Sequence, residues 1–207
     1  MLAPRPERST LDEETARADV YGLLAALYYA PPNPQLLAQL RVAVTEAPAA
    51  NGFLEEPWRA VVGAARECSD TAIQEEFDTL FGGVGKPEVC VYGSYYLSGF
   101  LNEKPLAVLR GDLTRLGLAR DDAMPETEDH IAYLCEVMRF LIAGDDVSVS
   151  NLTEQHHFFA AHLQPWVQQC CDALAQHPEA RFYAALARFT QAFMVVEAQA
   201  FDMLDRQ

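Results

Sequence analysis

Apolar residues recur at intervals of three and four along most of the chain, which is the spacing of one face of an α-helix. The clearest runs are Val20, Leu23, Leu24, Leu27 and Tyr28; Ile73, Phe77, Leu80 and Phe81; Ile131, Leu134, Met138, Leu141 and Ile142; and Phe182, Leu186, Phe189, Phe193, Val196 and Ala200. No alternating pattern is sustained and no segment repeats. The pattern predicts an all-α, single-domain helical bundle over residues 1–207.

Capping and breaking residues set the expected helix ends. A capping box at Thr10–Glu13 opens the first helix, and the prolines at 31–34 end it. Further helices are expected over 35–46, 58–67, 70–81 with Gln74 as reciprocal cap, 105–117, 129–143, 151–176 with a break at Pro165, and from Pro178 onward. This gives about eight or nine helices.

Three other segments are expected to connect these helices. Residues 47–51 and the glycine-rich stretch 82–93 are predicted loops, and 89–97 is irregular or a short helix. The polar, proline-containing segment 119–128 is a candidate hinge. The bundle is therefore either one unit or two closely joined sub-bundles that meet at this hinge.

The net charge narrows the class of partner. A formal charge of −15 argues strongly against a nucleic-acid partner, because a phosphate backbone requires clustered Lys and Arg. The same surplus would attract a basic peptide or protein surface. An alternative is that the acidic residues only keep the protein soluble.

Neither the first residues of the chain nor its cysteines indicate export. The first 14 residues lack the apolar core of a secretory signal, and no apolar run reaches the roughly 20 residues that span a bilayer. The five cysteines form no Cys-x-x-Cys pair. We therefore expect a cytoplasmic protein.

Acidic residues are concentrated around the candidate hinge. Six carboxylates and no Lys or Arg fall between residues 121 and 136: Asp121, Asp122, Glu126, Glu128, Asp129 and Glu136. Acids in a first helical turn stabilise the helix dipole, which explains Glu128 and Asp129. The density of carboxylates before them also suits a site for a positively charged peptide.

Two groups of aromatic residues are candidates for binding an apolar segment. Phe77, Leu80 and Phe81 share one helix face, which is typical of a core and also of a groove that accepts a helix. Tyr92, Tyr95 and Tyr96 fit an interface or a partly wet edge of the core.

Catalytic and metal-binding patterns are weak. His156, His157 and His162 lack the four-residue spacing of a zinc pair, and no nucleotide fingerprint is present. We expect no cofactor and no enzymatic activity. A helical enzyme that uses Asp129 and His130 with a metal or nucleotide, and a structural adaptor, stay open as alternatives.

Three elements of the middle of the chain together resemble the TorD/DmsD/NarJ family. They are the aromatic-x-x-Leu-Phe element ending at Phe81, the Tyr-Gly-Ser-Tyr-Tyr-Leu segment at 92–97, and the Glu-Thr-Glu-Asp-His-Ile segment at 126–131. The similarity is clearest over residues 70–144. In that family a proline usually precedes the Asp-His pair; here Glu128 takes its place, and Pro125 lies earlier.

The resemblance implies a cytoplasmic chaperone dedicated to a molybdenum-containing oxidoreductase. Such proteins bind the twin-arginine signal peptide or N-terminal region of the catalytic subunit until its cofactor is inserted, and some exchange helices to form homodimers. By this resemblance Glu126 and Asp129 would pair with the arginines, and His130 would fix the hinge, sense pH or cap the helix. The candidate peptide-binding residues are Phe77, Leu80, Phe81, Tyr92, Tyr95, Tyr96, Glu126, Asp129 and His130.

Overall fold

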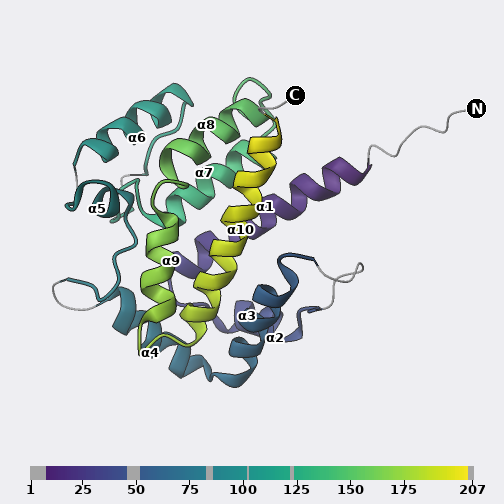
Figure 1. The fold of residues 1–207 in the computed structure, drawn as a ribbon, viewed down its shortest axis with the longest axis vertical. Helices are drawn as coiled ribbons and strands as arrows, with labels where there is room; N and C mark the ends of the chain where they lie inside the picture. Colours follow the sequence, from purple (N-terminus) through teal and green to yellow (C-terminus); the bar gives the residue numbers. More distant parts are fainter. Residues whose placement is uncertain (1–7, 46–51, 83–85, 102, 122–123, 205–207) are drawn as a thin grey trace, which may run out of the picture.

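The computed structural model of the protein describes residues 8–45, 52–82, 86–101, 103–121 and 124–204. These residues form ten α-helices and no named strand (Figure 1). The helices are α1 (Arg8–Tyr29), α2 (Pro34–Val42), α3 (Glu55–Glu67), α4 (Asp70–Phe81), α5 (Gly93–Ser98), α6 (Lys104–Arg115), α7 (Ile131–Ala143), α8 (Leu152–His162), α9 (Val167–Gln176) and α10 (Phe182–Leu204). The all-α prediction is confirmed. The count exceeds the prediction because α5 is a true short helix and the break at Pro165 separates α8 from α9.

One continuous core joins the helices. Buried apolar side chains from α1–α4 and α6–α10 form a single cluster, and Tyr96 of α5 packs against it. Helix α1 packs most extensively against α7, and α10 packs against α9, α3 and α4 (Figure 1). Because this apolar cluster is not divided at the candidate hinge, the described residues form one bundle.

A buried ion pair ties the two longest helices together. Both oxygens of the Glu197 carboxylate on α10 lie 2.8 Å from nitrogens of the Arg17 guanidinium on α1. The Tyr21 hydroxyl donates to the same carboxylate at 3.1 Å, and Glu197 is only 1% exposed. A buried charge of this kind requires its partners, so these contacts fix how α1 lies on α10.

Several helix ends agree with the capping signals and others do not. Asn151 caps α8 as expected, accepting from the Glu154 N–H at 3.1 Å. Helix α1 begins at Arg8, before the predicted capping box, and α2 ends at Val42, four residues early. Gln74 does not cap α4; Ser69 does, and Gln74 donates to Asp78. The predicted loop at 47–51 lies outside the described residues.

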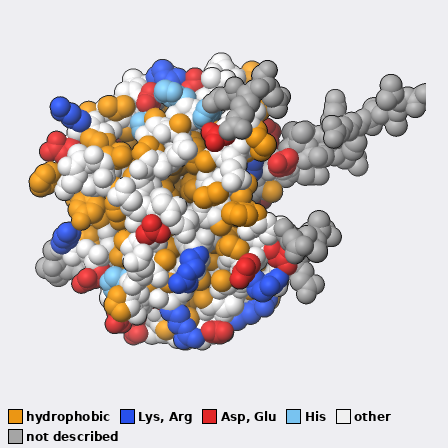
Figure 2. All heavy atoms as spheres, viewed as in Figure 1, with side chains coloured by type: hydrophobic (Ala, Val, Ile, Leu, Met, Phe, Trp, Pro, Cys, Tyr) orange, Lys and Arg blue, Asp and Glu red, His pale blue; other side chains and the backbone are white. Residues whose placement is uncertain are grey.

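Charge on the visible face is mixed. Figure 2 shows Lys and Arg side chains interspersed with Asp and Glu, so the negative surplus does not form a single acidic patch there. Among the described residues, none of the helices combines the length and the apolar character that crossing a membrane requires.

Candidate functional site

The second and third elements of the family resemblance meet in space. Residues 91–93 and 129–131 run antiparallel and form a single β-bridge between Tyr92 and His130. Two backbone hydrogen bonds of 2.9 Å, one on each side of the bridge, hold the segments together. The start of α5 and the start of α7 are therefore one junction.

Asp129 is the polar centre of this junction. One carboxylate oxygen accepts from the Ser94 backbone N–H at 2.9 Å and also from the Ser94 hydroxyl, and the other accepts from the Thr127 hydroxyl at 2.6 Å. Asp129 is 4% exposed. We expected Asp129 to pair with arginines of a partner, but in this structure its carboxylate is buried and already hydrogen-bonded.

His130 caps helix α7. Its Nδ1 accepts from the Ala132 N–H at 3.1 Å, and its ring lies among Tyr29, Tyr92 and Tyr133. Burial lowers the pKa of His130 to about 4, although nearby Glu126 and Asp129 act in the opposite direction. The ring is therefore neutral near pH 7, and it fixes the start of the helix; it does not sense pH in that range.

Tyr92 links the junction to the acidic segment, by which we mean residues 124–130 at and before the start of α7. Its hydroxyl donates to the Glu126 carboxylate across a short contact. Burial and this carboxylate both raise the pKa of the Tyr92 phenol, so the phenol stays protonated and remains a donor. Glu126 is thus held by the junction, at the edge where the segment 124–130 reaches solvent.

Tyr96 and Tyr95 extend the junction outward along α5. The Tyr96 ring stacks on Trp166, with 5.4 Å between ring centroids, and its hydroxyl donates to the Cys90 carbonyl at 2.7 Å. The ring of Tyr95 packs edge to face on that of Tyr96, with 5.2 Å between the centroids. The Lys86 ammonium lies 5.2 Å from the centroid of the Tyr95 ring. Of the three tyrosines, Tyr92 and Tyr96 support the site from within.

The aromatic stripe of α4 is not part of this cluster. Leu80 is fully buried, and the half-buried rings of Phe77 and Phe81 pack on Tyr183 of α10, with centroid distances of 5.8 and 5.1 Å. Helix α4 lies at the lower end of the bundle, and α5 and α6 lie at the upper left (Figure 1). The stripe therefore belongs to the core between α4 and α10.

An apolar groove runs beside the acidic segment. Its volume is about 580 Å³, and it lies between the end of α6, residues 118–121, Met124, Glu128 and α7. Its apolar walls come from Leu113, Leu118, Ala119, Met124, Val137, Phe140 and Ala143, and charged side chains of Arg120, Asp121, Glu128, Glu136 and Arg139 line its rim. A smaller hollow shares Met124, Tyr133 and Glu136 with it and continues to Tyr29 of α1.

The patterns described above do not predict the groove, although one feature of the sequence points to it. Phe140 lies on the polar side of α7, opposite the periodic apolar face, and is 40% exposed. Val137 and Ala143 of the same helix line the groove beside Phe140, and a contiguous apolar patch is more typical of a binding surface than a single exposed apolar residue is. The walls contributed by Leu113, Leu118, Ala119 and Met124 have no such signal, because the course of a loop over a helix is set by long-range contacts.

The acidic segment is partly neutralised by arginines from outside it. The Arg110 guanidinium donates two hydrogen bonds to the Glu128 carboxylate, at 3.0 and 2.9 Å. Arg120 donates to the carbonyls of Met124 and Glu126. Burial raises the pKa of the Glu128 carboxyl, but the hydrogen bonds and charge of Arg110, a backbone hydrogen bond and the charge of Arg120 together hold this pKa below its usual range. The segment is therefore an acid–arginine network and not an unpaired acidic patch.

Metal ligands do not gather in the part of the chain that the structure describes: no three His, Cys, Asp or Glu side chains are grouped to hold an ion. The five cysteines are all buried and unbridged.

Comparison with known proteins places the chain in a family. The sequence model of the family described as nitrate reductase delta subunit matches residues 46–172, more than half of the chain. A protein named chaperone protein TorD from Shewanella loihica is 26% identical over 215 residues, covering 95% of this chain and 98% of that protein. A TorD chaperone of Vibrio cholerae is 26% identical over 146 residues, covering 67% of this chain and 66% of its own length. The chain belongs to the nitrate reductase delta subunit family, which includes the TorD redox-enzyme maturation chaperones.

Proposed function

We propose that this protein is a cytoplasmic chaperone for the catalytic subunit of a molybdenum-containing oxidoreductase. It binds the subunit's twin-arginine signal peptide, or a related N-terminal segment, and holds the apoprotein until the cofactor is inserted. Membership of a family whose relatives are named TorD chaperones supports a chaperone, not an enzyme. The same membership implies a molybdoenzyme as partner.

The groove between α7 and the residues at 118–121, 124 and 128 is the proposed binding site of the peptide. It adjoins the 126–131 segment that carries the family resemblance, and its apolar walls end at a rim with three carboxylates, Asp121, Glu128 and Glu136. A peptide with arginines followed by an apolar stretch complements both features, since the apolar part is removed from water while the arginines meet the rim. This adjacency is the observation that carries the proposal.

Several of the residues first considered for peptide binding then act as supports. Asp129 and His130 fix the junction at which the acidic segment connects to the start of α7. Tyr92 holds Glu126 at the edge of the same segment. Leu80, Phe77 and Phe81 stabilise α4 against α10. We therefore expect substitutions at these positions to change stability first and peptide affinity second.

A matched pair of substitutions tests this binding site. Phe140→Asp places a charge on the wall of the groove. Val108→Asp places the same charge on an exposed part of α6 that does not line the groove. Titration calorimetry with a synthetic twin-arginine signal peptide should show about tenfold weaker binding for Phe140→Asp, because burial of a large apolar side chain is lost. Val108→Asp should bind like wild type. Equal affinities for both variants and wild type would contradict this location.

Isolation of the tagged protein from its host, grown anaerobically, tests the client. The expected result is a molybdoenzyme catalytic subunit retained with its signal peptide. Absence of such a subunit under every electron acceptor tried would contradict the proposal.

Helix exchange between two chains is a further part of the proposal. The loops 82–93 and 119–128, whose residues 83–85 and 122–123 lie outside the described residues, are the proposed exchange points. Light scattering after size-exclusion chromatography should detect a dimer beside the monomer, and shortening one loop should change their ratio. A monomer at all concentrations would contradict exchange.

A further inference from the structure

Two of the chain's own arginines converge on one carboxylate of the groove. Glu128 lines the groove, and its side chain is 13% exposed. Arg110 of α6 binds it through two hydrogen bonds at 3.0 and 2.9 Å, and Nε of Arg120 lies 4.0 Å away. A two-pronged guanidinium–carboxylate contact is the same contact that an arginine of a bound peptide would make.

The two arginines differ in how firmly they are held. Arg120 also donates to the carbonyls of Met124 and Glu126, at 2.9 and 3.0 Å, and so fixes the course of the segment. Arg110 is 52% exposed, and the hydrogen bonds that its side chain donates within the described residues go to Glu128. When Arg110 turns into solvent, it gives up its contacts with Glu128, and Arg120 and the incoming arginine remain to pair with that carboxylate. Departure of Arg120 would in addition free two carbonyls of the segment.

The other carboxylates near the groove are less suited to exchange. Asp129 is buried and saturated by Ser94 and Thr127. Glu126 accepts from Tyr92, whose phenol stays protonated. Glu136 is 46% exposed and Asp121 is exposed too, so solvent weakens any pair that they make. Glu128 alone among these five combines a position in the groove, shielding from water and a partner that can leave.

We infer that Glu128 receives an arginine of the client peptide and that Arg110 occupies this carboxylate until the client displaces it. The inference rests on the proposed function and names the residues that set its specificity. For a client arginine the exchange replaces one two-pronged pair by another. A lysine makes a single-point contact, so a peptide with lysines would break a better pair than it forms. By competing for Glu128, Arg110 weakens the binding of segments that lack arginine more than the binding of those that carry it.

A double-mutant cycle on peptide affinity tests the exchange. The four proteins are wild type, Arg110→Gln, Glu128→Gln and the double variant, each titrated with the twin-arginine peptide. Arg110→Gln should bind about three- to fivefold more tightly, since the competing pair is gone. Glu128→Gln should cost about tenfold in the Arg110→Gln background, where a client arginine loses its charged partner. Arg110→Gln should have no effect once Glu128 is replaced.

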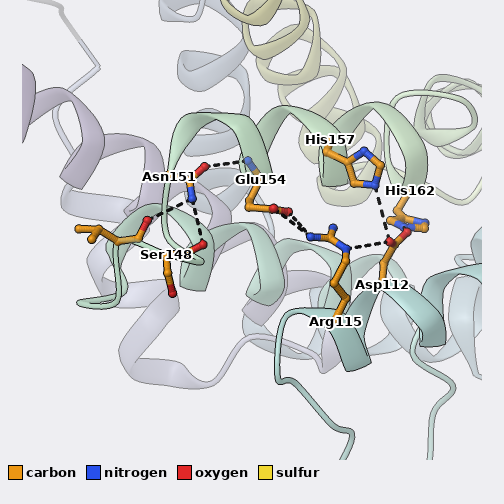
Figure 3. Close-up of polar contacts among 8 residues, drawn as sticks. Asp112, Arg115, Ser148, Asn151, Glu154, His157 and His162 are labelled. Atoms are coloured by element: carbon orange, nitrogen blue, oxygen red, sulfur yellow. Dashed lines mark hydrogen bonds and ion pairs between the residues drawn. The ribbon is translucent and has the colours of Figure 1, made fainter.

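A matched control lies five residues further along the same helix. Arg115 is 45% exposed, pairs with Glu154 of α8 at 2.8 Å and with Asp112 of its own helix at 3.6 Å (Figure 3), and does not line the groove. If loosening α6 were the cause of tighter binding, Arg115→Gln would tighten it as well. We expect Arg115→Gln to bind like wild type, and tightening equal to that of Arg110→Gln would overturn the inference.

The peptide itself provides the second control. With both arginines changed to lysine, the gain on Arg110→Gln should shrink to about twofold or less, because lysine cannot form the two-pronged contact. Equal affinities of all four proteins for the twin-arginine peptide overturn the exchange and leave the proposed function standing. Failure of all four proteins to bind it overturns the proposed function itself.

Discussion

The carboxylate of Asp129 accepts hydrogen bonds from both the backbone N–H and the hydroxyl of Ser94, which lies 35 residues earlier in the chain. These bonds join the start of α5 to the start of α7, and the Thr127 hydroxyl completes the shell at 2.6 Å. Because a buried donor left without its acceptor is costly, the junction depends on this one side chain. We therefore expect removal of the Asp129 carboxylate to destabilise the fold.

Asp129→Ala should lower the free energy of unfolding by about 2–4 kcal/mol, since three hydrogen bonds are lost and two donors of Ser94 are left buried. Urea denaturation followed by circular dichroism measures this change. Glu136→Ala is the control, because its carboxylate is 46% exposed and it should cost about 0.5 kcal/mol or less. Equal unfolding midpoints for the two variants would mean that Asp129 does not hold the junction.

Phe77→Ala should behave as a core substitution. The ring packs edge to face on Phe81 at 5.0 Å and on Tyr183 at 5.8 Å, and its removal leaves a cavity between α4 and α10. We expect a loss of about 3 kcal/mol in unfolding free energy, with unchanged affinity of the folded protein for the signal peptide. Normal stability combined with weakened peptide binding would place Phe77 in the binding site instead.

Local patterns predicted the helices but not all of their ends. The apolar faces of α4 and α7 and the Asn151 cap depend on residues that are close in the sequence, so they could be predicted from it. Helix α10 starts at Phe182 and not at Pro178, because the Glu76 carboxylate of α4 accepts from the N–H groups of residues 181–183. That cap comes from 105 residues away, and a periodic pattern contains no information about it.

The candidate site was predictable in its parts and not in their roles. The segments at 92–97 and 126–131 were singled out, and the structure joins them. The sequence predicted an unpaired acidic stretch at 121–136. In the structure Glu128 is paired, because Arg110 and Arg120, which lie outside this stretch, reach it. A surplus of carboxylates in one stretch therefore says little about local charge until the neighbouring helices are placed.

Gly93 and Gly63 should respond to alanine in opposite directions. A Cβ at Gly93 would lie 2.9 Å from Nε1 of Trp166, which is held in place by a 2.6 Å hydrogen bond to the His162 carbonyl. Gly93→Ala should therefore cost about 1–3 kcal/mol through overpacking. Gly63, inside α3, has no neighbour within 4 Å of such an atom, and Gly63→Ala should stabilise by about 0.5–1 kcal/mol. Thermal unfolding of both variants measures the difference, and a stabilised Gly93→Ala would show that α5 does not press on the indole.

His130 makes stability depend on pH in a defined window. Its pKa is lowered to about 4 by burial, while an unfolded chain titrates near 6.5. Between these values the unfolded state binds more protons than the folded state, so stability is complete above about pH 6.5 and falls as the pH is lowered towards 4. The part due to His130 amounts to at most about 3 kcal/mol.

His130→Asn tests this linkage, because asparagine can still cap α7 but does not titrate in the window. Urea midpoints measured from pH 7 to pH 4.5 should fall less steeply for His130→Asn than for wild type, even if the variant is less stable at pH 7. His162, whose pKa is also lowered by burial, still contributes a slope in both proteins. His157→Asn, at a side chain that is 55% exposed, controls for the removal of an imidazole and should keep the wild-type slope. Parallel pH profiles for wild type and His130→Asn would mean that the ring is not buried neutral at the start of α7.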